Sequence, residues 1–365
     1  MQIKEIIGFL ESVAPPYYQE SYDNCGLLTG NDSWECKGIL CTLDTLEATV
    51  EEAKAKGCNL IISHHPILFS GIKKLNGKNY VERTVIAALK NDIAIYAIHT
   101  NLDNVYTGVS KKMCDILGLI NTKILAPKAG ELLQFSTYAP KAFAQQVMNV
   151  LFEHGAGHIG NYSECSFSYE GKGSFMPGEQ SNPKIGEANK REYVDEIKVE
   201  CLLPKHIPLA GIVEGLKKIG FYEEVAYNVI PLQNIHQEVG SGMIGETEKE
   251  IDEKDFLRLV KDKFRLSTIR HTALLNRKIK KVALCGGSGS FLLPTARKQK
   301  ADVYITSDVK YHEFFDAEGE ILLADIGHFE SEQFTIELLF DILRTKFSTF
   351  AVLKTENCTN PVYYM

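Results

Sequence analysis

Residues 59–66 read Asn-Leu-Ile-Ile-Ser-His-His-Pro, a short apolar run that passes directly into titratable side chains and a proline. Apolar runs of this length, rich in isoleucine and bounded by proline, are typical of buried strands. Similar runs occupy 93–98 and 321–324, and amphipathic helical patterns such as that of 46–56 lie between runs of this kind. The alternation predicts βαβ units, in which helices cover the faces of a mainly parallel sheet.

This alternation extends to about residue 124 and returns after residue 235, which predicts two α/β lobes. The middle of the chain follows the order strand, helix, strand, strand, helix, strand, which is the split-βαβ, ferredoxin-like arrangement. Within it, the stretch 171–191 is rich in Gly, Pro, Ser, Asn and Lys and is predicted to be a long loop. The predicted domains are a first α/β lobe at 1–125, an inserted α+β domain at 126–233 and a second α/β lobe at 234–365.

Composition excludes several classes of protein. A chain of 365 residues with 44% hydrophobic and 24% charged residues lies in the globular range. The net charge is −7 and no run of five or six basic residues occurs, so nucleic acid is not expected as a partner. Nine scattered cysteines without a C-x-x-C pair indicate reduced thiols. The first 15 residues form an amphipathic pattern rather than a signal peptide, and no stretch reaches the ~20 apolar residues of a membrane span. We therefore expect a cytoplasmic protein that does not enter a membrane.

Two adjacent histidines, His64 and His65, follow the first apolar run. In open α/β sheets ligands bind beyond the carboxyl ends of strands, so polar residues at these positions are candidates for a site. Adjacent residues on a regular strand point to opposite faces, so the chain must bend if both imidazoles are to reach one ligand. Pro66 ends the strand and permits that bend. The alternative is a structural histidine pair that hydrogen-bonds to the backbone.

A second pair, His328 and Glu332, follows the run at 321–324 and begins a helical segment. Glu332 lies on the line of the apolar stripe of that segment, which continues to Phe347. A carboxylate on a buried face is costly unless it is paired or bound to a metal ion. The alternative is a partly solvated glutamate that is favoured by the helix macrodipole.

The run at 93–98 is followed by His99 and Asp103. Asp103 could equally be a turn residue, because aspartate commonly bonds to its own backbone in turns. Together, three imidazoles and two carboxylates form a mixed ligand set that suits Zn, Fe or Mn. We predict that two divalent ions, ~3.5–4 Å apart and bridged by Glu332, lower the pKa of a shared water. The predicted ligands are His64, His65, Asp103, His328 and Glu332, whereas His99 is predicted to act catalytically, as a proton shuttle, or to support a ligand.

At these residues the sequence resembles the Nif-three-like family of dinuclear-metal proteins, which are also called GTP cyclohydrolase I type II homologues. The motifs that carry the resemblance span essentially the whole chain. They are Asp-Asn-Cys-Gly-Leu-Leu at 23–28, Ser-His-His-Pro at 63–66, His-Thr-Asn-Leu-Asp at 99–103, Gly-His-Ile-Gly-Asn-Tyr at 157–162, Thr-Ser-Asp-Val-Lys-Tyr-His at 306–312 and Asp-Ile-Gly-His-Phe-Glu-Ser-Glu at 325–332. Ser307 and the Ser-Lys-Lys of 110–112 depart from the usual pattern of the family, at positions that could alter the cleft.

The resemblance implies that the five predicted ligands bind two metal ions and that the two lobes form one metal-binding domain. It also implies that the insert resembles the nitrogen-regulatory PII and CutA fold, and that subunits assemble into a toroidal homohexamer. The activity it implies is GTP cyclohydrolase-like ring opening, which needs an activated water.

Weaker signals lie near the same strand ends. The run Gly-Gly-Ser-Gly-Ser at 286–290 follows an apolar strand, and its amides could cradle a phosphate, although it matches neither common nucleotide-binding motif. Asp308, Lys310 and His312 are further candidates for contact with a substrate.

Three functions remain open from the sequence. The leading hypothesis is a metal-dependent hydrolase in which a metal-bound hydroxide attacks a small-molecule substrate, for which a nucleotide is one candidate. The alternative is a metal-loaded regulatory or scaffold protein whose insert senses a ligand, without catalysis. The third is nucleotide binding through the glycine-rich run alone.

Overall fold

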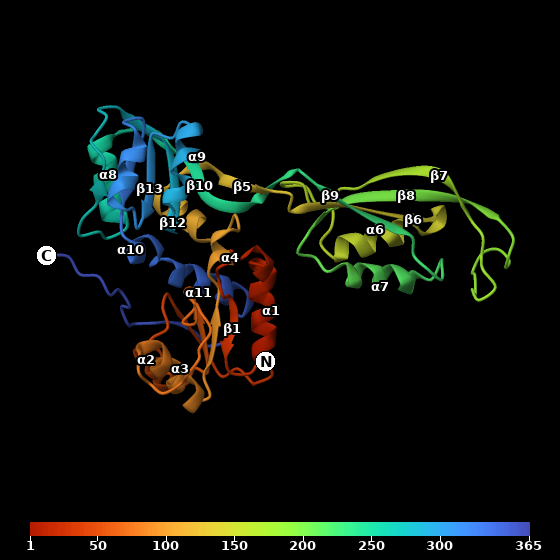
Figure 1. The fold of residues 1–365 in the computed structure, drawn as a ribbon, viewed down its shortest axis with the longest axis horizontal. Helices are drawn as coiled ribbons and strands as arrows, with labels where there is room; N and C mark the ends of the chain where they lie inside the picture. The colour runs from red at the N-terminus through yellow and green to blue at the C-terminus, as the bar shows by residue number, and fades with distance from the viewer. The chain divides into compact units, whose positions relative to one another are not determined.

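A computed structural model describes every residue from Met1 to Met365. The chain is a mixed α/β protein with three sheets, which confirms the predicted mixture of helices and strands in several sheets (Figure 1). It divides into two compact units. The first combines Met1–Pro127 with Glu238–Met365, and the second is Lys128–Gln237. We call them the outer unit and the inner unit, after their places in the sequence.

The first sheet of the outer unit contains the apolar run that precedes His64 and His65. In order across the sheet, its strands are β1 (Gly26–Thr29), β4 (Ala94–Ala97), β3 (Leu60–Ser63), β2 (Ile39–Thr42) and β15 (Val352–Lys354). All are parallel except β1, which pairs with β4 in the antiparallel sense. The C-terminal strand β15 therefore belongs to the same sheet as β1 to β4, because it pairs with β2.

Helices cover both faces of this sheet, which explains why its central strands β2, β3 and β4 are buried at every position rather than at alternate ones. The covering helices are α1 (Ile3–Val13) and α11 (Thr335–Lys346) on one face, and α2 (Glu47–Ala55) and α3 (Tyr80–Lys90) on the other. Leu60 and Ile62 pack in the first of these layers, and Ile61, which points the opposite way, packs in the second.

The second sheet of the outer unit has the order β11 (Arg270–His271), β14 (Leu322–Asp325), β13 (Val303–Ser307), β12 (Lys278–Ser288), β10 (Ile235–Asp252) and β5 (Ile120–Ala129). Strands β12, β13 and β14 are parallel, so their carboxyl ends meet at one edge. One face packs against α5 (Val109–Leu117) and α8 (Glu253–Lys263), and the other against α9 (Leu293–Lys298) and the 3-10 helix η4 (Tyr311–Ala317).

The inner unit contains one antiparallel sheet and two helices. Along the chain its elements are β6 (Leu132–Pro140), α6 (Ala144–Glu153), β7 (Phe167–Phe175), β8 (Glu192–Pro204), α7 (Leu209–Ile219) and β9 (Tyr227–Leu232). The order across the sheet is β7-β8-β6-β9, and every pairing is antiparallel. Both helices pack through their apolar sides on the same core, which includes Phe135 and Val199.

The strands β7 and β8 are longer than the sequence predicted, and the loop between them is correspondingly shorter. Strand β7 continues to Phe175 and β8 begins at Glu192, so part of the loop predicted at 171–191 is paired sheet. Two of the glycines that suggested a loop are paired with β8, Gly171 with Glu196 and Gly173 with Val194. Cross-strand hydrogen bonds outweigh the weak strand propensity of glycine here.

None of the helices combines the length and the apolar character that crossing a bilayer would require.

Candidate metal centre

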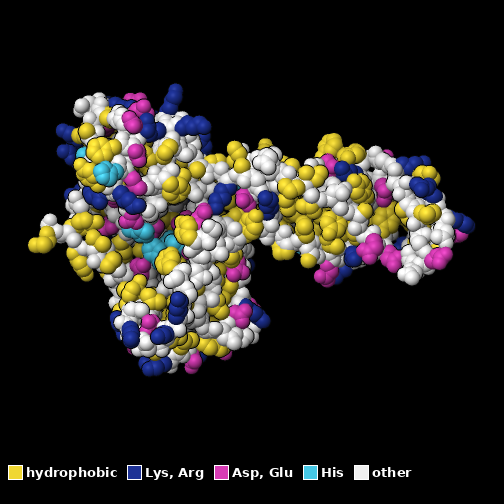
Figure 2. Space-filling model, viewed as in Figure 1, with side chains coloured by type: hydrophobic (Ala, Val, Ile, Leu, Met, Phe, Trp, Pro, Cys, Tyr) yellow, Lys and Arg dark blue, Asp and Glu magenta, His cyan; other side chains and the backbone are white.

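The carboxyl edges of the two sheets in the outer unit meet at a cluster of histidines and carboxylates. His65 follows β3 and His99 follows β4, whereas His328 begins the short helix α10 (His328–Glu332) after β14. Asp103 ends the short helix α4 (Thr100–Asp103), which begins just after His99. Figure 2 shows histidine and acidic side chains gathered where this cluster reaches the surface.

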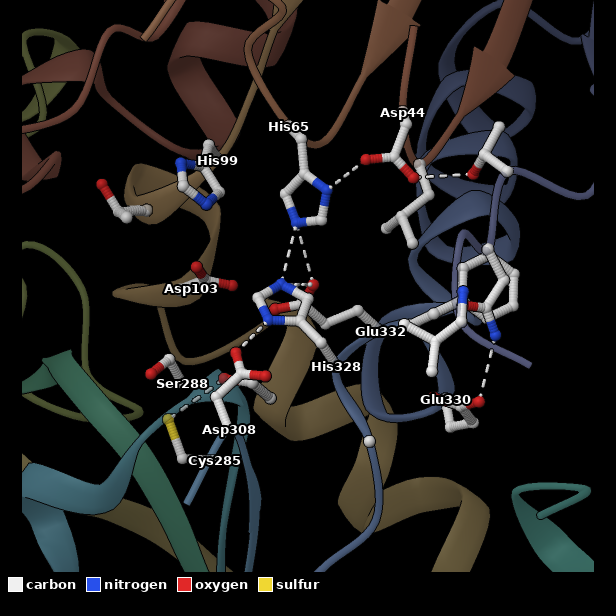
Figure 3. A pocket seen from close by; sticks show the side chains of 18 of the residues that line it. Asp44, His65, His99, Asp103, Cys285, Ser288, Asp308, His328, Glu330 and Glu332 are labelled. Carbon is white, nitrogen blue, oxygen red and sulfur yellow. Dashed lines mark hydrogen bonds and ion pairs between the residues drawn. The ribbon is translucent and has the colours of Figure 1, made fainter. Parts of the chain in front are cut away.

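The structure brings the five predicted ligands together in two groups, within each of which the candidate ligand atoms all lie within 4.8 Å of one another. One group is His64, Asp103 and Glu332, and the other is His65, His328 and Glu332. Both contain Glu332, whose side chain points between His65 and His328 in Figure 3. Residues that are separated by 267 positions in the chain therefore share one site.

The two oxygens of Glu332 face different groups. Its Oε2 lies 2.9 Å from Nε2 of His65 and 3.0 Å from Nε2 of His328. Its Oε1 lies 3.9 Å from Nε2 of His64, which in turn is 3.6 Å from Oδ1 of Asp103. A carboxylate placed between two sets of ligands in this way has the arrangement of a bridging ligand.

Two polar atoms of the cluster have no hydrogen-bond partner although they are buried. They are Nε2 of His64 and Oδ1 of Asp103. Unpaired polar atoms in a protein interior are costly and therefore uncommon. Imidazole nitrogen and carboxylate oxygen are both good ligands of Zn, Fe and Mn, so the residues present fit a divalent ion at this point.

Every histidine of the cluster is oriented by a hydrogen bond from its other ring nitrogen. The partners of Nδ1 are the backbone oxygen of Ile98 for His64 at 2.9 Å, Oδ1 of Asp44 for His65 at 2.7 Å, Oδ1 of Asp23 for His99 at 2.8 Å, and Oδ2 of Asp308 for His328 at 2.6 Å. When Nδ1 donates its proton to such an acceptor, the lone pair of Nε2 is directed at the cluster. Figure 3 shows this arrangement for His65 and His328.

The partners Asp44 and Asp23 were not among the predicted site residues, although Asp23 belongs to one of the quoted motifs. Asp44 follows β2 at the same edge of the first sheet. The rule that located the histidines, that ligands bind beyond strand ends, would also have located Asp44. Thr359, near the end of the chain, donates a hydrogen bond of 2.6 Å to Asp44 Oδ2 and extends this network.

Charges within the cluster shift the pKa values of the histidines in opposite directions. Burial lowers the pKa of His64 to about 4. Burial alone would also lower the pKa of His65, but hydrogen bonds to Asp44 and Glu332 outweigh it and raise the value to about 9. The same competition, with Asp308 and Glu332 as partners, raises the pKa of His328 to about 11. Without ions, protons on His65 and His328 therefore balance the buried negative charge.

The pKa values of the two carboxyl groups of the cluster are also shifted in opposite directions. Burial and the neighbouring charge of Glu332 raise the pKa of Asp103 well above its ordinary value. Burial opposes ionisation of Glu332 too, but hydrogen bonds from the histidines, His328 foremost, hold its pKa well below the ordinary range. Strongly perturbed groups that converge in one cleft are typical of functional sites.

The glycine-rich run at 286–290 packs against Glu332, and two of its amides already bond within the protein. The backbone N–H of Gly287 donates to Oγ of Ser331, and that of Gly289 donates to Oγ1 of Thr306. A side chain at Gly287, whose φ is +62°, would overlap Oε1 of Glu332 and lie 3.3 Å from its Cδ. Glycine is needed here because the backbone approaches the carboxylate closely.

His99 does not belong to the two groups that share Glu332, but it forms a third group with His64 and His65, whose candidate ligand atoms also lie within 4.8 Å of one another. Its ring centroid lies 5.1 Å from that of His64 and 5.3 Å from that of His65. Of the three residues predicted on the substrate side, Asp308 lines the pocket above the cluster, whereas Lys310 and His312 are exposed and do not line it.

Comparisons with known proteins agree with the resemblance that the motifs suggested. The model of the family Duf34/NIF3 (NGG1p interacting factor 3) matches residues 1–361. A Bacillus subtilis protein named "GTP cyclohydrolase 1 type 2 homolog" is 38% identical over 328 residues, covering 89% of this chain and 88% of its own. A Staphylococcus aureus protein of the same name is 35% identical and covers 96% and 94%.

Solved structures show the same fold. The crystal structure of a Bacillus cereus protein related to NIF3 has a TM-score of 0.87 and 33% identity, covering 100% of this chain and 99% of that one. A Staphylococcus aureus protein has a TM-score of 0.78 at 28% identity, with the same coverage. Because the family match spans nearly the whole chain and relatives exceed 30% identity over most of it, this protein belongs to the DUF34/NIF3 family.

Proposed function

We propose that the protein binds two divalent metal ions and is a metal-dependent hydrolase. Glu332 carries the proposal, because its two oxygens face two separate sets of ligand atoms. One ion would be held by His64, Asp103 and Glu332, and the other by His65, His328 and Glu332. The unpaired Nε2 of His64 and Oδ1 of Asp103 gain a partner in this arrangement.

Bound ions of this kind lower the pKa of water and polarise an electrophile, so that hydrolysis proceeds at neutral pH. The chain's own residues supply orientation and proton transfer. Asp44 and Asp308 fix the imidazoles of His65 and His328 through Nδ1. We propose that His99 accepts or donates a proton at Nε2, because Asp23 holds its Nδ1 and the ring lies beside the cluster.

The relatives named "GTP cyclohydrolase 1 type 2 homolog" suggest a purine substrate, which is opened by attack of water on the ring. The mixed imidazole and carboxylate ligands are compatible with Zn, Fe or Mn. We propose this class of hydrolysis for the protein.

We further propose that the inner unit is a PII/CutA-like domain inserted between two similar α/β lobes, and that the subunits form a toroidal homohexamer. Support comes from the order β7-β8-β6-β9, in which the hairpin strand β8 separates β7 from β6. The strand register places Phe167, Tyr169 and Ile230 on the face opposite the helices, and all three are exposed. Light scattering after gel filtration tests the assembly, and a monomeric mass would contradict it.

The test of the metal centre is elemental analysis of the protein purified without chelator. We expect about two metal equivalents per chain, falling sharply in Glu332→Ala because both ions lose a ligand. Glu330→Ala is the matched control, since this carboxylate lies on the same short helix but bonds to Asn360 instead of the histidines. Equal metal content in the two variants, or little metal in any sample after reconstitution, would refute the dinuclear site.

The test of catalysis follows on metal-loaded protein. Turnover of GTP or a related purine, lost in Glu332→Ala and retained in Glu337→Ala, would support hydrolysis; Glu337 lies on α11 beside Lys112 and does not line the pocket. Full metal content without turnover of any purine would support the metal site and refute the proposed activity.

A further inference from the structure

The pocket above the cluster has a volume of about 1310 Å³ and lies wholly within the outer unit. Ligand pockets of small molecules typically measure roughly 300–1,000 Å³, so a nucleoside-sized molecule fits without tight constraint on shape. The chemistry of the wall, rather than its size, therefore selects the ligand.

Negative charge dominates the wall of this pocket. Its carboxylates are Glu20, Asp44, Asp103, Asp308, Asp325, Glu330 and Glu332. The single Lys or Arg side chain is Arg270, which lies 3.1 Å from Asp325 and also donates to the backbone oxygen of Val309. The seven negative charges of these carboxylates thus exceed the four positive charges of two divalent ions together with the single positive charge of Arg270. A polyanionic ligand would meet net repulsion.

Two backbone amides of the glycine-rich run, those of Gly287 and Gly289, are not available to a phosphate, because they already donate to Ser331 and Thr306. A triphosphate would therefore depend mainly on the ions and on Arg270 for favourable contacts.

Six aromatic side chains also line the wall. They are Tyr22, Phe69, Tyr80, Phe291, Phe329 and Tyr364. Phe291 is 65% exposed and Phe69 is 55% exposed, so both rings present free surface to the pocket that they line. The Phe69 ring stands edge-on to His99 with centroids 5.7 Å apart, so an aromatic surface adjoins the cluster directly.

We infer that this pocket binds an uncharged, planar heteroaromatic molecule, with its ring against Phe69 and Phe291 and its N–H groups donating to carboxylates of the wall. The inference rests on the proposed function and names the substrate class of that site. A purine ring, which the relatives' name suggests, belongs to this class of ligand, whereas a triphosphate does not. Stacking on aromatic side chains supplies affinity for a ring of this kind, and ionised carboxylates are strong acceptors for its N–H groups.

The test compares guanosine with GTP, because the two probes share one ring and differ only in phosphates. Binding to metal-loaded protein, dialysed free of unbound ions, is measured by calorimetry at low and at moderate salt. We expect guanosine to bind at least ten-fold more tightly than GTP at low salt. Added salt should narrow the gap, because it screens the repulsion of the phosphates.

Two variants locate the binding surface. Phe291→Ala and Phe69→Ala should each weaken guanosine binding by roughly ten-fold, given what stacking on one aromatic side chain contributes. Both side chains are largely exposed, so their removal should not unfold the protein. Phe167→Ala, which removes a 68% exposed ring from the inner unit, is the matched control and should bind guanosine normally.

The inference is overturned if GTP binds as tightly as guanosine, if neither phenylalanine variant weakens guanosine, or if neither guanosine nor adenosine binds below about 1 mM. These outcomes are distinct from failure of the proposed function. Guanosine binding without hydrolysis would uphold the inference and refute only the activity, and metal content is measured separately in each sample.

Discussion

Substituting Gly287 tests the centre without removing any proposed ligand. A Cβ at this position would lie 3.3 Å from Cδ of Glu332 and 3.5 Å from Cε1 of His328, and would overlap Oε1 of Glu332. Carbon atoms pack at roughly 3.5–4.0 Å, so in Gly287→Ala the carboxylate must shift by on the order of half an ångström or more. Metal sites tolerate deviations of only about 0.2 Å in ligand distance. We therefore expect a loss of at least about ten-fold in metal affinity.

The control is Gly118→Ala, because Gly118 has nearly the same backbone conformation. Its φ is +66°, against +62° for Gly287, but nothing lies within 4 Å of a Cβ placed there. Both substitutions cost roughly 1–2 kcal/mol for placing an L-residue in the left-handed region. Thermal unfolding of the metal-free variants should therefore show this strain in both, with a further loss in Gly287→Ala from the contact with Glu332.

Metal affinity, measured by competition with a chromophoric chelator, should fall only in Gly287→Ala. Unchanged affinity in that variant would refute the reasoning, because it would mean that the position of Glu332 does not determine ion binding. Equal losses in both variants would show that backbone strain, and not contact with the carboxylate, is responsible.

Three further predictions concern His65 and the carboxylate that orients it. Asp44→Asn should weaken metal binding by about 10–100-fold, as is typical when a hydrogen-bond partner of a ligating histidine is altered. Thr359→Val should also weaken metal binding, but less strongly. Normal metal affinity in Asp44→Asn would contradict the role of this carboxylate. Because the pKa of His65 is raised to about 9, ions must displace a proton, so affinity should rise from pH 6 to pH 8 and calorimetry in two buffers should detect proton release. The stability of the metal-free protein should change with pH in the opposite direction. The stabilisation from protonated His65 is complete below the unfolded pKa of about 6.5 and is lost as the pH rises through about 9. Chemical denaturation at pH 6 and pH 9 will measure this loss.

Much of the candidate site could be predicted because of one property of parallel sheets. Residues that follow β3, β4 and β14 lie at carboxyl edges, where polar groups collect. Bending of the chain after β3, predicted from Pro66, is consistent with the rings of His64 and His65 lying 5.0 Å apart. The resemblance to the family was confirmed, while metal ligation by these residues stays a prediction.

Other features could not be predicted from the sequence, because the local residue pattern indicated one structure and the tertiary contacts produced another. The glycine-rich run has the composition of a phosphate-binding loop, yet its amides bond to Ser331 and Thr306, which come from other elements. The glycines near 171–173 suggested a loop, but pairing with β8 makes them strand. Glycine marks unusual backbone geometry without saying what approaches it.

The sequence by itself determined the alternation of strands and helices, the fully buried strands and the titratable residues that follow them, because these depend on periodicity and on neighbours within a few residues. Only the tertiary structure decided that Glu332 stands between His65 and His328, that Asp44 and Asp308 orient the histidines, and that Arg270 is the single Lys or Arg side chain of an acidic pocket. These relations join residues up to 267 positions apart and arise when two separately formed sheet edges pack together. No local pattern records which side chains then meet, because packing across an interface depends on shape and charge from both sides.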